Sequence, residues 1–111
     1  MKTQNRELLE AAAKASGIAV DWRKGVDCLC YSSSPYNEAW NPLADDGDAF
    51  RLACKLKLNI AQGDYSAAVN DEGEIDEAGL VRNDDERAEV VRRLIVVAAA
   101  AMAERAAVGA A

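Results

Sequence analysis

The stretch "WNPLADDGDAFRLACKL", residues 40–56, joins an acidic cluster directly to an amphipathic pattern. Three aspartates, Asp45, Asp46 and Asp48, surround a single glycine at the start of that pattern. Apolar residues then follow at the i, i+3, i+4, i+7 spacing of one helix face, which predicts a helix over about 46–57: Ala49, Leu52, Ala53 and Leu56. In this prediction Phe50 and Cys54 widen the apolar stripe, and Arg51 and Lys55 lie on the opposite side.

The aspartate cluster has two interpretations. In the first, Asp45 or Asp46 caps the helix and Asp48 lies in its first turn, because carboxylates accept hydrogen bonds from the unpaired N–H groups there. In the second, the cluster binds a cation or a small ligand. A calcium loop needs oxygen ligands at alternating positions and a distant glutamate, and this stretch departs from that spacing after its first residue. The pattern therefore favours capping and predicts no metal ligands here.

Patterns on both sides of this stretch predict further helices and strands. The N-terminal "TQNRELLEAAAKASG", residues 3–17, predicts a helix with Gly17 just past its end. Alternating apolar residues with turn signals between them predict two hairpins and a short edge strand, over residues 18–22, 28–32, 58–62, 65–69 and 79–81. A last helix, from residues 83–85 to about 107, has a predicted buried face of Val91, Leu94, Ile95, Ala98 and Met102.

These elements predict one α+β domain over residues 1–111, in the order α-β-β-α-β-β-α with the short edge strand 79–81 before the last helix. We expect one antiparallel sheet with three helices on one face, because that arrangement buries every apolar stripe. The long C-terminal helix packs on the sheet in this prediction. A chain of this size has limited stability in reserve, so self-association as a homodimer is a reasonable expectation.

The composition argues against several classes of function. The net charge is −6, from 19 acidic and 13 basic residues, which disfavours general attraction to nucleic acid or to an anionic membrane. Histidine is absent from the sequence, which removes the commonest general base and most zinc sites. Neither a glycine-rich phosphate loop nor a nucleophile motif occurs. We therefore expect no catalytic residues, no cofactor and no enzymatic activity.

The cysteines and the N-terminus predict a reducing, cytoplasmic setting. Cys28 and Cys30 are two residues apart, which on a strand places both thiols on one face but poorly for bonding each other. With Cys54 they are expected to be buried or half-buried thiols. The N-terminus is polar and unlike a signal peptide. The longest apolar run, residues 94–103, is about half of the roughly 20 residues that a membrane span needs.

Two groups of residues are candidates for contact with a protein partner. Tyr36 and Trp40 lie in or beside a proline-containing loop, where Trp40 either covers the core or contacts a partner. The segment 64–89 holds ten acids against two arginines, and its residues 70–79 are expected to form a solvated loop. Such a loop could imitate nucleic-acid phosphates and occupy a basic groove on the partner. Its candidate residues are Asp71, Glu72, Glu74, Asp76 and Glu77.

Three segments together resemble a group of small proteins of tailed-phage and prophage genomes. These segments are "LLEAAAKASG" at 8–17, the central "WNPLADDGDAFRLACKL" and the closing "ERAEVVRRLIVVAAAAMAE". Members of the group carry a "WNPL-DDGDALRLAVKL" centre, and the region 59–83 has no counterpart in the resemblance. No activity is assigned to the group, so the resemblance implies a phage or prophage origin.

That origin favours a non-enzymatic accessory protein that binds a host protein, as an inhibitor of a host defence system of the anti-CRISPR type. Tyr36, Trp40, Asp45 and Asp46, with the acids of 71–77, are the predicted contacts. A nucleic-acid-associated module is an alternative, with a basic patch on the 46–57 helix: Arg51, Lys55 and Lys57, joined by Arg23 and Lys24. A metal- or small-ligand-binding protein built on Asp45, Asp46 and Asp48 is the other alternative.

Overall fold

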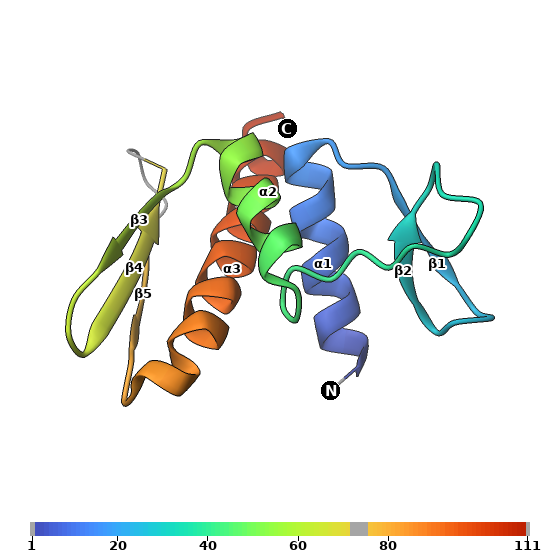
Figure 1. Ribbon diagram of the computed structural model, residues 1–111. Helices are drawn as coiled ribbons and strands as arrows, with labels where there is room; N and C mark the ends of the chain where they lie inside the picture. The colour runs from blue at the N-terminus through green and yellow to red at the C-terminus, as the bar shows by residue number, and fades with distance from the viewer. Residues whose placement is uncertain (1, 72–75, 111) are drawn as a thin grey trace.

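Three helices form the centre of the molecule, and an antiparallel sheet lies on either side of them (Figure 1). The computed structural model describes residues 2–71 and 76–110, with side chains described for 5–71 and 76–106. The elements are α1 (Lys2–Ser16), β1 (Val20–Arg23), β2 (Cys28–Tyr31), α2 (Asp46–Leu56), β3 (Asn59–Gln62), β4 (Ser66–Asn70), β5 (Asp76–Leu80) and α3 (Asp84–Ala110). This α+β architecture and its element order confirm the prediction, including the long C-terminal helix packed on a sheet.

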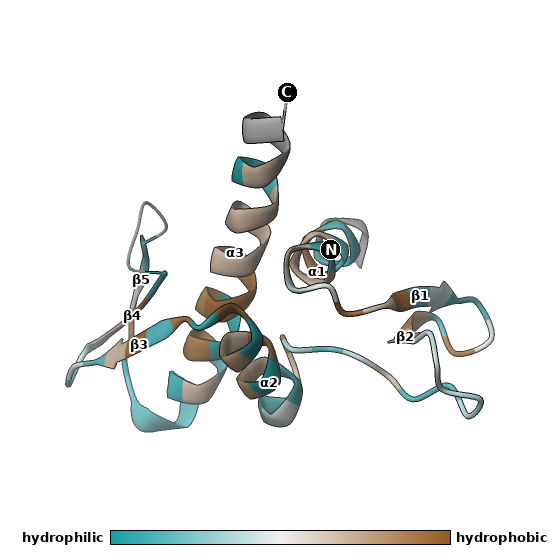
Figure 2. Ribbon diagram, turned by 90° about the horizontal axis from the view of Figure 1, so that it is seen from above, coloured by the Kyte–Doolittle hydropathy of each residue, from teal (hydrophilic) through white to brown (hydrophobic). Residues whose placement is uncertain are grey.

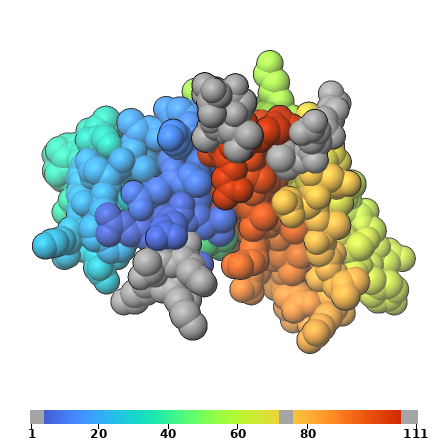
Figure 3. Space-filling view, turned by 180° about the vertical axis from the view of Figure 1, so that it is seen from behind, coloured from blue at the N-terminus to red at the C-terminus, as the bar shows by residue number. Residues whose placement is uncertain are grey.

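Alanine side chains allow α1 and α3 to pack closely. Ala12 and Ala13 on α1, and Ala98 and Ala99 on α3, are all buried in the same core cluster. Small residues bring two helix axes near each other, so that many weak dispersion contacts replace a few large ones. Figure 3 shows the two helices side by side from behind. The high alanine content of this chain therefore forms part of its core.

The three-stranded sheet covers the other side of α3. Its strand order is β3-β4-β5, and both pairings are antiparallel. The central strand buries Ala67 and Val69, two residues apart on one face, against the helix. Gly79 of β5 lies directly on α3: a Cβ there would be 3.3 Å from Val90 Cγ1. Glycine at this position lets the strand approach the helix closely.

Both α1 and α2 end with hydrogen bonds that close the last turn. Gly17 has φ +76°, and Ile18 N–H donates to the Ala13 carbonyl at 3.1 Å, as predicted for a glycine cap. At the end of α2 the same left-handed position is taken by Lys57, with φ 56°. A lysine pays a steric penalty there that glycine avoids.

The prediction of a single sheet is wrong. The β1–β2 hairpin forms a separate two-stranded sheet beyond α1, on the opposite side of the helices from β3–β5 (Figure 1). Because α1 packs directly on α3, the two hairpins cannot share an edge. The hairpin buries Leu29 and Cys30, and Trp22 packs against the core cluster. The pairing of α1 with α3 therefore decided the topology.

Two local predictions also need correction. Phe50 and Cys54 are exposed, so they do not belong to the buried stripe of α2, which consists of Asp48, Ala49, Leu52 and Ala53. In the acidic segment expected to be a loop, residues 76–80 form the edge strand β5, and residues 72–75 lie outside the described residues. The strand begins at Asp76, three residues before the predicted position, because its alternate residues Glu77 and Gly79 face α3.

Candidate functional site

Asp45 caps α2, as the first interpretation of the cluster predicted. Its extended backbone and its carboxylate place Oδ2 2.8 Å from the backbone N–H of Asp48, which donates to it. This bond satisfies one of the N–H groups that a helix leaves unpaired at its start. Asp46 and Asp48 follow in the first turn, where the positive end of the helix dipole stabilises their negative charge.

Asp48 is buried and accepts hydrogen bonds from three parts of the chain. Tyr31 Oη of β2 donates at 2.9 Å, the backbone N–H of Asn41 at 3.0 Å and Arg51 Nη2 at 2.7 Å. Burial of a carboxylate is tolerated only with such partners. The carboxylate therefore ties the β1–β2 hairpin and the 32–45 loop to α2. We call Tyr31, Asn41, Asp45, Asp48 and Arg51 the α2 junction.

The α2 junction changes the acid–base behaviour of Tyr31. Burial raises the pKa of its phenol above the ordinary value of 10.0, and the hydrogen bond to Asp48 raises it further. The phenol is therefore a stable donor at neutral pH and unsuited to act as a base. Its role in the structure is to hold the hairpin.

Asp46 points away from the junction and pairs with α3. Its Oδ1 lies 2.6 Å from Arg92 Nη1, while Arg92 Nε donates to the Leu43 carbonyl at 2.9 Å. The three aspartates are therefore committed to three different contacts. Among the described residues there is no group of three or more histidine, cysteine, aspartate or glutamate side chains that could hold a metal ion.

The two aromatic candidates separate completely in the structure. Trp40 is 1% exposed and belongs to the core cluster, so a partner cannot reach it. Its Nε1 is buried and has no hydrogen-bond partner in the part of the chain that the structure describes. Tyr36, 89% exposed on the 32–39 loop, remains available for contact. Burial of Trp40 decides between its two interpretations in favour of the core.

The acidic candidates are not one solvated surface. Asp71 has a largely buried side chain, and its Oδ2 lies 3.0 Å from Arg105 Nη2 of α3. Asp76 is exposed at the start of β5, and Glu77 is half-buried on the face toward α3. Glu72 and Glu74 lie outside the described residues. The expected acidic loop therefore presents fewer carboxylates than its sequence indicates.

The basic patch loses its two arginines to internal contacts. Arg23 donates to the carbonyls of Ser34 and Tyr31 at 2.7 and 3.1 Å, which fixes the loop after β2. Arg51 pairs with Asp48 in the α2 junction. Lys24, Lys55 and Lys57 stay exposed, but Lys24 lies on the hairpin, away from α2. The arrangement gives little support to a nucleic-acid surface.

The cysteines are three free thiols in different environments. Cys28 and Cys30 lie on one face of β2 with their sulfurs 3.7 Å apart, and Cys30 is buried. Burial, together with the neighbouring Cys30, raises the pKa of the Cys28 thiol, which disfavours the reactive thiolate. Cys54 is exposed on α2, contrary to the expectation that it would be buried.

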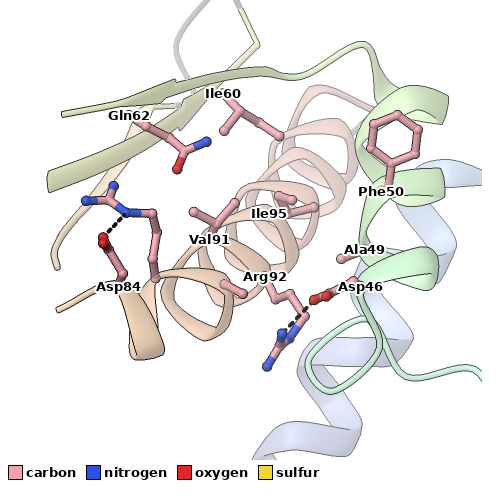
Figure 4. Close-up of a pocket in the computed structure, with 11 residues that line it drawn as sticks. Asp46, Ala49, Phe50, Ile60, Gln62, Asp84, Val91, Arg92 and Ile95 are labelled. Atoms are coloured by element: carbon pink, nitrogen blue, oxygen red, sulfur yellow. Dashed lines mark hydrogen bonds and ion pairs between the residues drawn. The ribbon is translucent and has the colours of Figure 1, made fainter. Parts of the chain in front are cut away.

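A groove of about 440 Å³ lies between α2, β3 and α3 (Figure 4). Its walls are mainly apolar: Ala49, Phe50, Ile60, Ala88, Val91 and Ile95. Gln62 and two ion pairs complete it: Asp46 with Arg92, and Asp84 with Arg87. Figure 2 shows hydrophobic residues where α2 meets α3, while the first turn of α3 is hydrophilic. We call this surface the α2–β3–α3 groove.

Large apolar side chains at this groove remain exposed to water. Phe50 is 67% exposed and Ile60 39% exposed. Figure 4 shows Ile60 and Gln62 extending from β3 toward Val91 and Ile95 on α3, with Phe50 on the neighbouring helix. All four residues of β3 are exposed. Apolar groups gathered around a hollow are typical of an interaction surface.

Sequence reasoning missed this groove, although one signal was present. Of the groove residues only Asp46 was a candidate, and for a different reason. Phe50 is out of phase with the i, i+3, i+4, i+7 set of α2, which places it beside the buried stripe. Ile60 gives no such signal, because its exposure depends on how α2 and α3, which are distant in the sequence, pack around β3.

The comparisons with known proteins do not identify this chain. No protein-family model matches it, and neither a curated protein nor a solved structure does. Across residues 2–71 and 76–110, none of the helices is long and apolar enough to cross a membrane. The geometry of the chain itself therefore carries the functional argument.

Proposed function

We propose that this chain is a non-enzymatic accessory protein whose function is to bind another protein through the α2–β3–α3 groove. The observation that carries the proposal is the exposure of Phe50 and Ile60 around an apolar hollow of about 440 Å³. Removal of such apolar side chains from water contributes about 25 cal/mol of favourable free energy per Å², before the costs of association are subtracted. Aromatic residues beside a hollow commonly supply much of the binding energy of an interface.

The resemblance to phage and prophage proteins supplies the kind of partner in this proposal. It makes the partner a host protein, and inhibition of a host defence complex is the outcome that this origin favours. Of the proposed contacts that lie in the described residues, Tyr36, Asp46 and Asp76 stay exposed. Trp40, Asp45 and Asp71 are engaged within the fold, and Glu77 is half-buried. Tyr36 lies on a different loop and would add a second, separate contact.

Affinity capture from a bacterial host lysate tests the proposal when two variants are compared. Phe50→Glu places a charge in the groove, while Leu80→Glu makes the same change at an exposed leucine of β5 that does not line it. We expect wild type and Leu80→Glu to capture the same protein in stoichiometric amount, and Phe50→Glu to lose it. Circular dichroism must show all three folded.

Two capture results would overturn the groove as the contact surface. Capture that persists unchanged in Phe50→Glu removes the groove as the contact surface. Capture lost only in Leu80→Glu moves the contact to the sheet. Catalytic turnover of a captured host protein by this chain would contradict the non-enzymatic part of the proposal.

A further inference from the structure

The edge strand β3 leaves a specific set of backbone groups without a strand neighbour. In the three-stranded sheet β3 is an outer strand, and within the described residues no strand pairs with its other edge. Gly63 N–H donates to the Ser66 carbonyl at 2.9 Å, next to the Gln62–Ala67 pair. Hydrogen-bonded pairs alternate along an antiparallel ladder. Ala61 and Asn59 therefore bond to β4, while the N–H and C=O groups of Ile60 and Gln62 point off the open edge.

The same two residues project their side chains into the groove. Ile60 and Gln62 both line it, and they lie opposite Val69 and Ala67, which are buried on the α3 side of the sheet. A strand that paired with this edge would place every second side chain on that same face. Those side chains would enter the hollow beside Phe50 and above Ile95. The open edge and the apolar hollow are thus parts of one surface.

The charges that a partner meets at this groove are mainly negative. In the two ion pairs of the groove, the arginine side chains of Arg92 and Arg87 are 19% and 20% exposed. Their partners Asp46 and Asp84 are 77% and 95% exposed. Figure 4 places both aspartates across the hollow from Ile60. Lysine or arginine side chains extending from a strand on β3 could lay their stems over the apolar floor and reach these carboxylates.

We propose that the groove takes an extended basic segment of the partner, which adds a strand to the open edge of β3. Its inward side chains alternate between a large apolar anchor and a lysine or arginine that pairs with Asp46 or Asp84. Backbone bonds to Ile60 and Gln62 supply affinity, and the hollow supplies selectivity. This inference rests on the proposed function and adds the conformation and charge of the segment that is bound.

A displayed library of random 12-residue peptides, selected on the full chain at low salt, tests the ligand chemistry. We expect enriched peptides to place a large apolar residue and a lysine or arginine two positions apart, so that both side chains face the hollow. Enrichment of a helical i, i+3, i+4 pattern would overturn strand addition in favour of a helix in the groove. Enrichment of acidic peptides, or of none above background, would overturn the inference as a whole.

Proline at the open edge tests the backbone contact, with affinity for a synthesised enriched peptide measured by fluorescence anisotropy. Gln62→Pro removes an N–H that points away from β4, so the ladder of the hairpin keeps its bonds. We expect at least a tenfold loss of affinity. Gln62→Ala reports the loss of the side chain alone, and the additional loss in the proline variant belongs to the N–H. Equal affinities of the two variants would overturn strand addition.

A change made on the peptide keeps this test decisive if Gln62→Pro unfolds. N-methylation of the peptide amides that face β3 should abolish binding, while methylation of the alternate amides should not. If neither set of methylated peptides loses binding, or both lose it equally, the strand arrangement is overturned. The protein itself stays unmodified in this test.

Charge removal tests the basic character of the ligand. Asp84→Asn should weaken the peptide several-fold and reduce the dependence of affinity on salt. Asp85→Asn makes the same change one residue away and outside the groove, and should have a smaller effect. Equal effects of the two substitutions would indicate only general electrostatic attraction and would overturn the pairing of the peptide with Asp84. Lysate capture lost in Phe50→Glu but kept in the proline and charge variants would separate failure of this inference from failure of the proposed function.

Discussion

The α2 junction lies at the start of α2, and the α2–β3–α3 groove lies along its side. The two regions differ in whether their side chains have partners within the fold. In the junction, Asp48 has three donors within 3.0 Å, and Asp45 caps the helix. In the groove, Phe50 and Ile60 stay exposed and the edge of β3 is open. A buried polar group with several hydrogen-bond partners indicates a structural role, whereas exposed apolar side chains around a hollow indicate a surface for contact.

Substitution of Trp40 should break the fold most severely. Trp40→Ala removes a side chain that is fully buried in the core cluster and leaves a cavity. We expect a loss of about 3–5 kcal/mol in the free energy of unfolding, measured by urea denaturation. A loss below about 1 kcal/mol would show that Trp40 is not core and would reopen its role as a contact.

Loss of the central carboxylate comes next in expected effect. Asp48→Ala leaves Tyr31 Oη and the Asn41 N–H without their acceptor. Each group left unpaired costs about 1–3 kcal/mol, so the two together should lower the free energy of unfolding by at least about 2 kcal/mol. Urea denaturation measures the change, with Glu89→Ala on the exposed side of α3 as the control. A loss no greater than that of the control would contradict the architectural role of the junction.

Removal of the helix cap should have a smaller effect. Asp45→Ala removes the acceptor of the Asp48 N–H, which should cost about 1 kcal/mol. Asp45→Asn keeps an oxygen acceptor and should retain most of the stability. Thermal unfolding of both variants checks the prediction. Equal losses in the two would mean that the charge of Asp45 matters more than its cap.

The raised pKa of Tyr31 predicts a specific alkaline instability. Because the folded chain holds the phenolic proton more tightly than the unfolded chain, this stabilisation is complete below pH 10 and is lost as pH rises toward the higher folded pKa. Tyr31→Phe should therefore flatten the decline in stability above pH 10. Urea denaturation between pH 8 and 11.5 tests it, and an unchanged slope would contradict the junction's effect on Tyr31.

Substitution in the groove should change stability least. Phe50→Ser removes an exposed ring, so we expect a change within about 0.5 kcal/mol in the free energy of unfolding. Thermal unfolding of Phe50→Ser measures this change, and binding measured on the same variant shows whether affinity is lost while stability is kept. A destabilisation above about 1.5 kcal/mol would show that Phe50 supports the fold, and the groove would then be part of the architecture.

Local patterns predicted the elements well because local chemistry decides them. The Asp45 cap, the Gly17 cap and the apolar spacing of α2 each depend on neighbours within one turn. The strands were predicted within one or two residues, apart from β5, whose acidic sequence disguises a strand with one face on α3. Contacts such as Asp71 with Arg105 join residues 34 apart, which no local pattern reports.

The sequence by itself determined the helices, their caps, the hairpins and the α+β class, because hydrogen bonding and apolar periodicity act over short stretches of chain. Only the tertiary structure decided that α1 pairs with α3, that the sheets are separate and that Trp40 is core. It also decided that Phe50 and Ile60 stay uncovered beside an open strand edge. Exposure of a side chain is set by which distant elements reach it, and that depends on packing across the whole molecule.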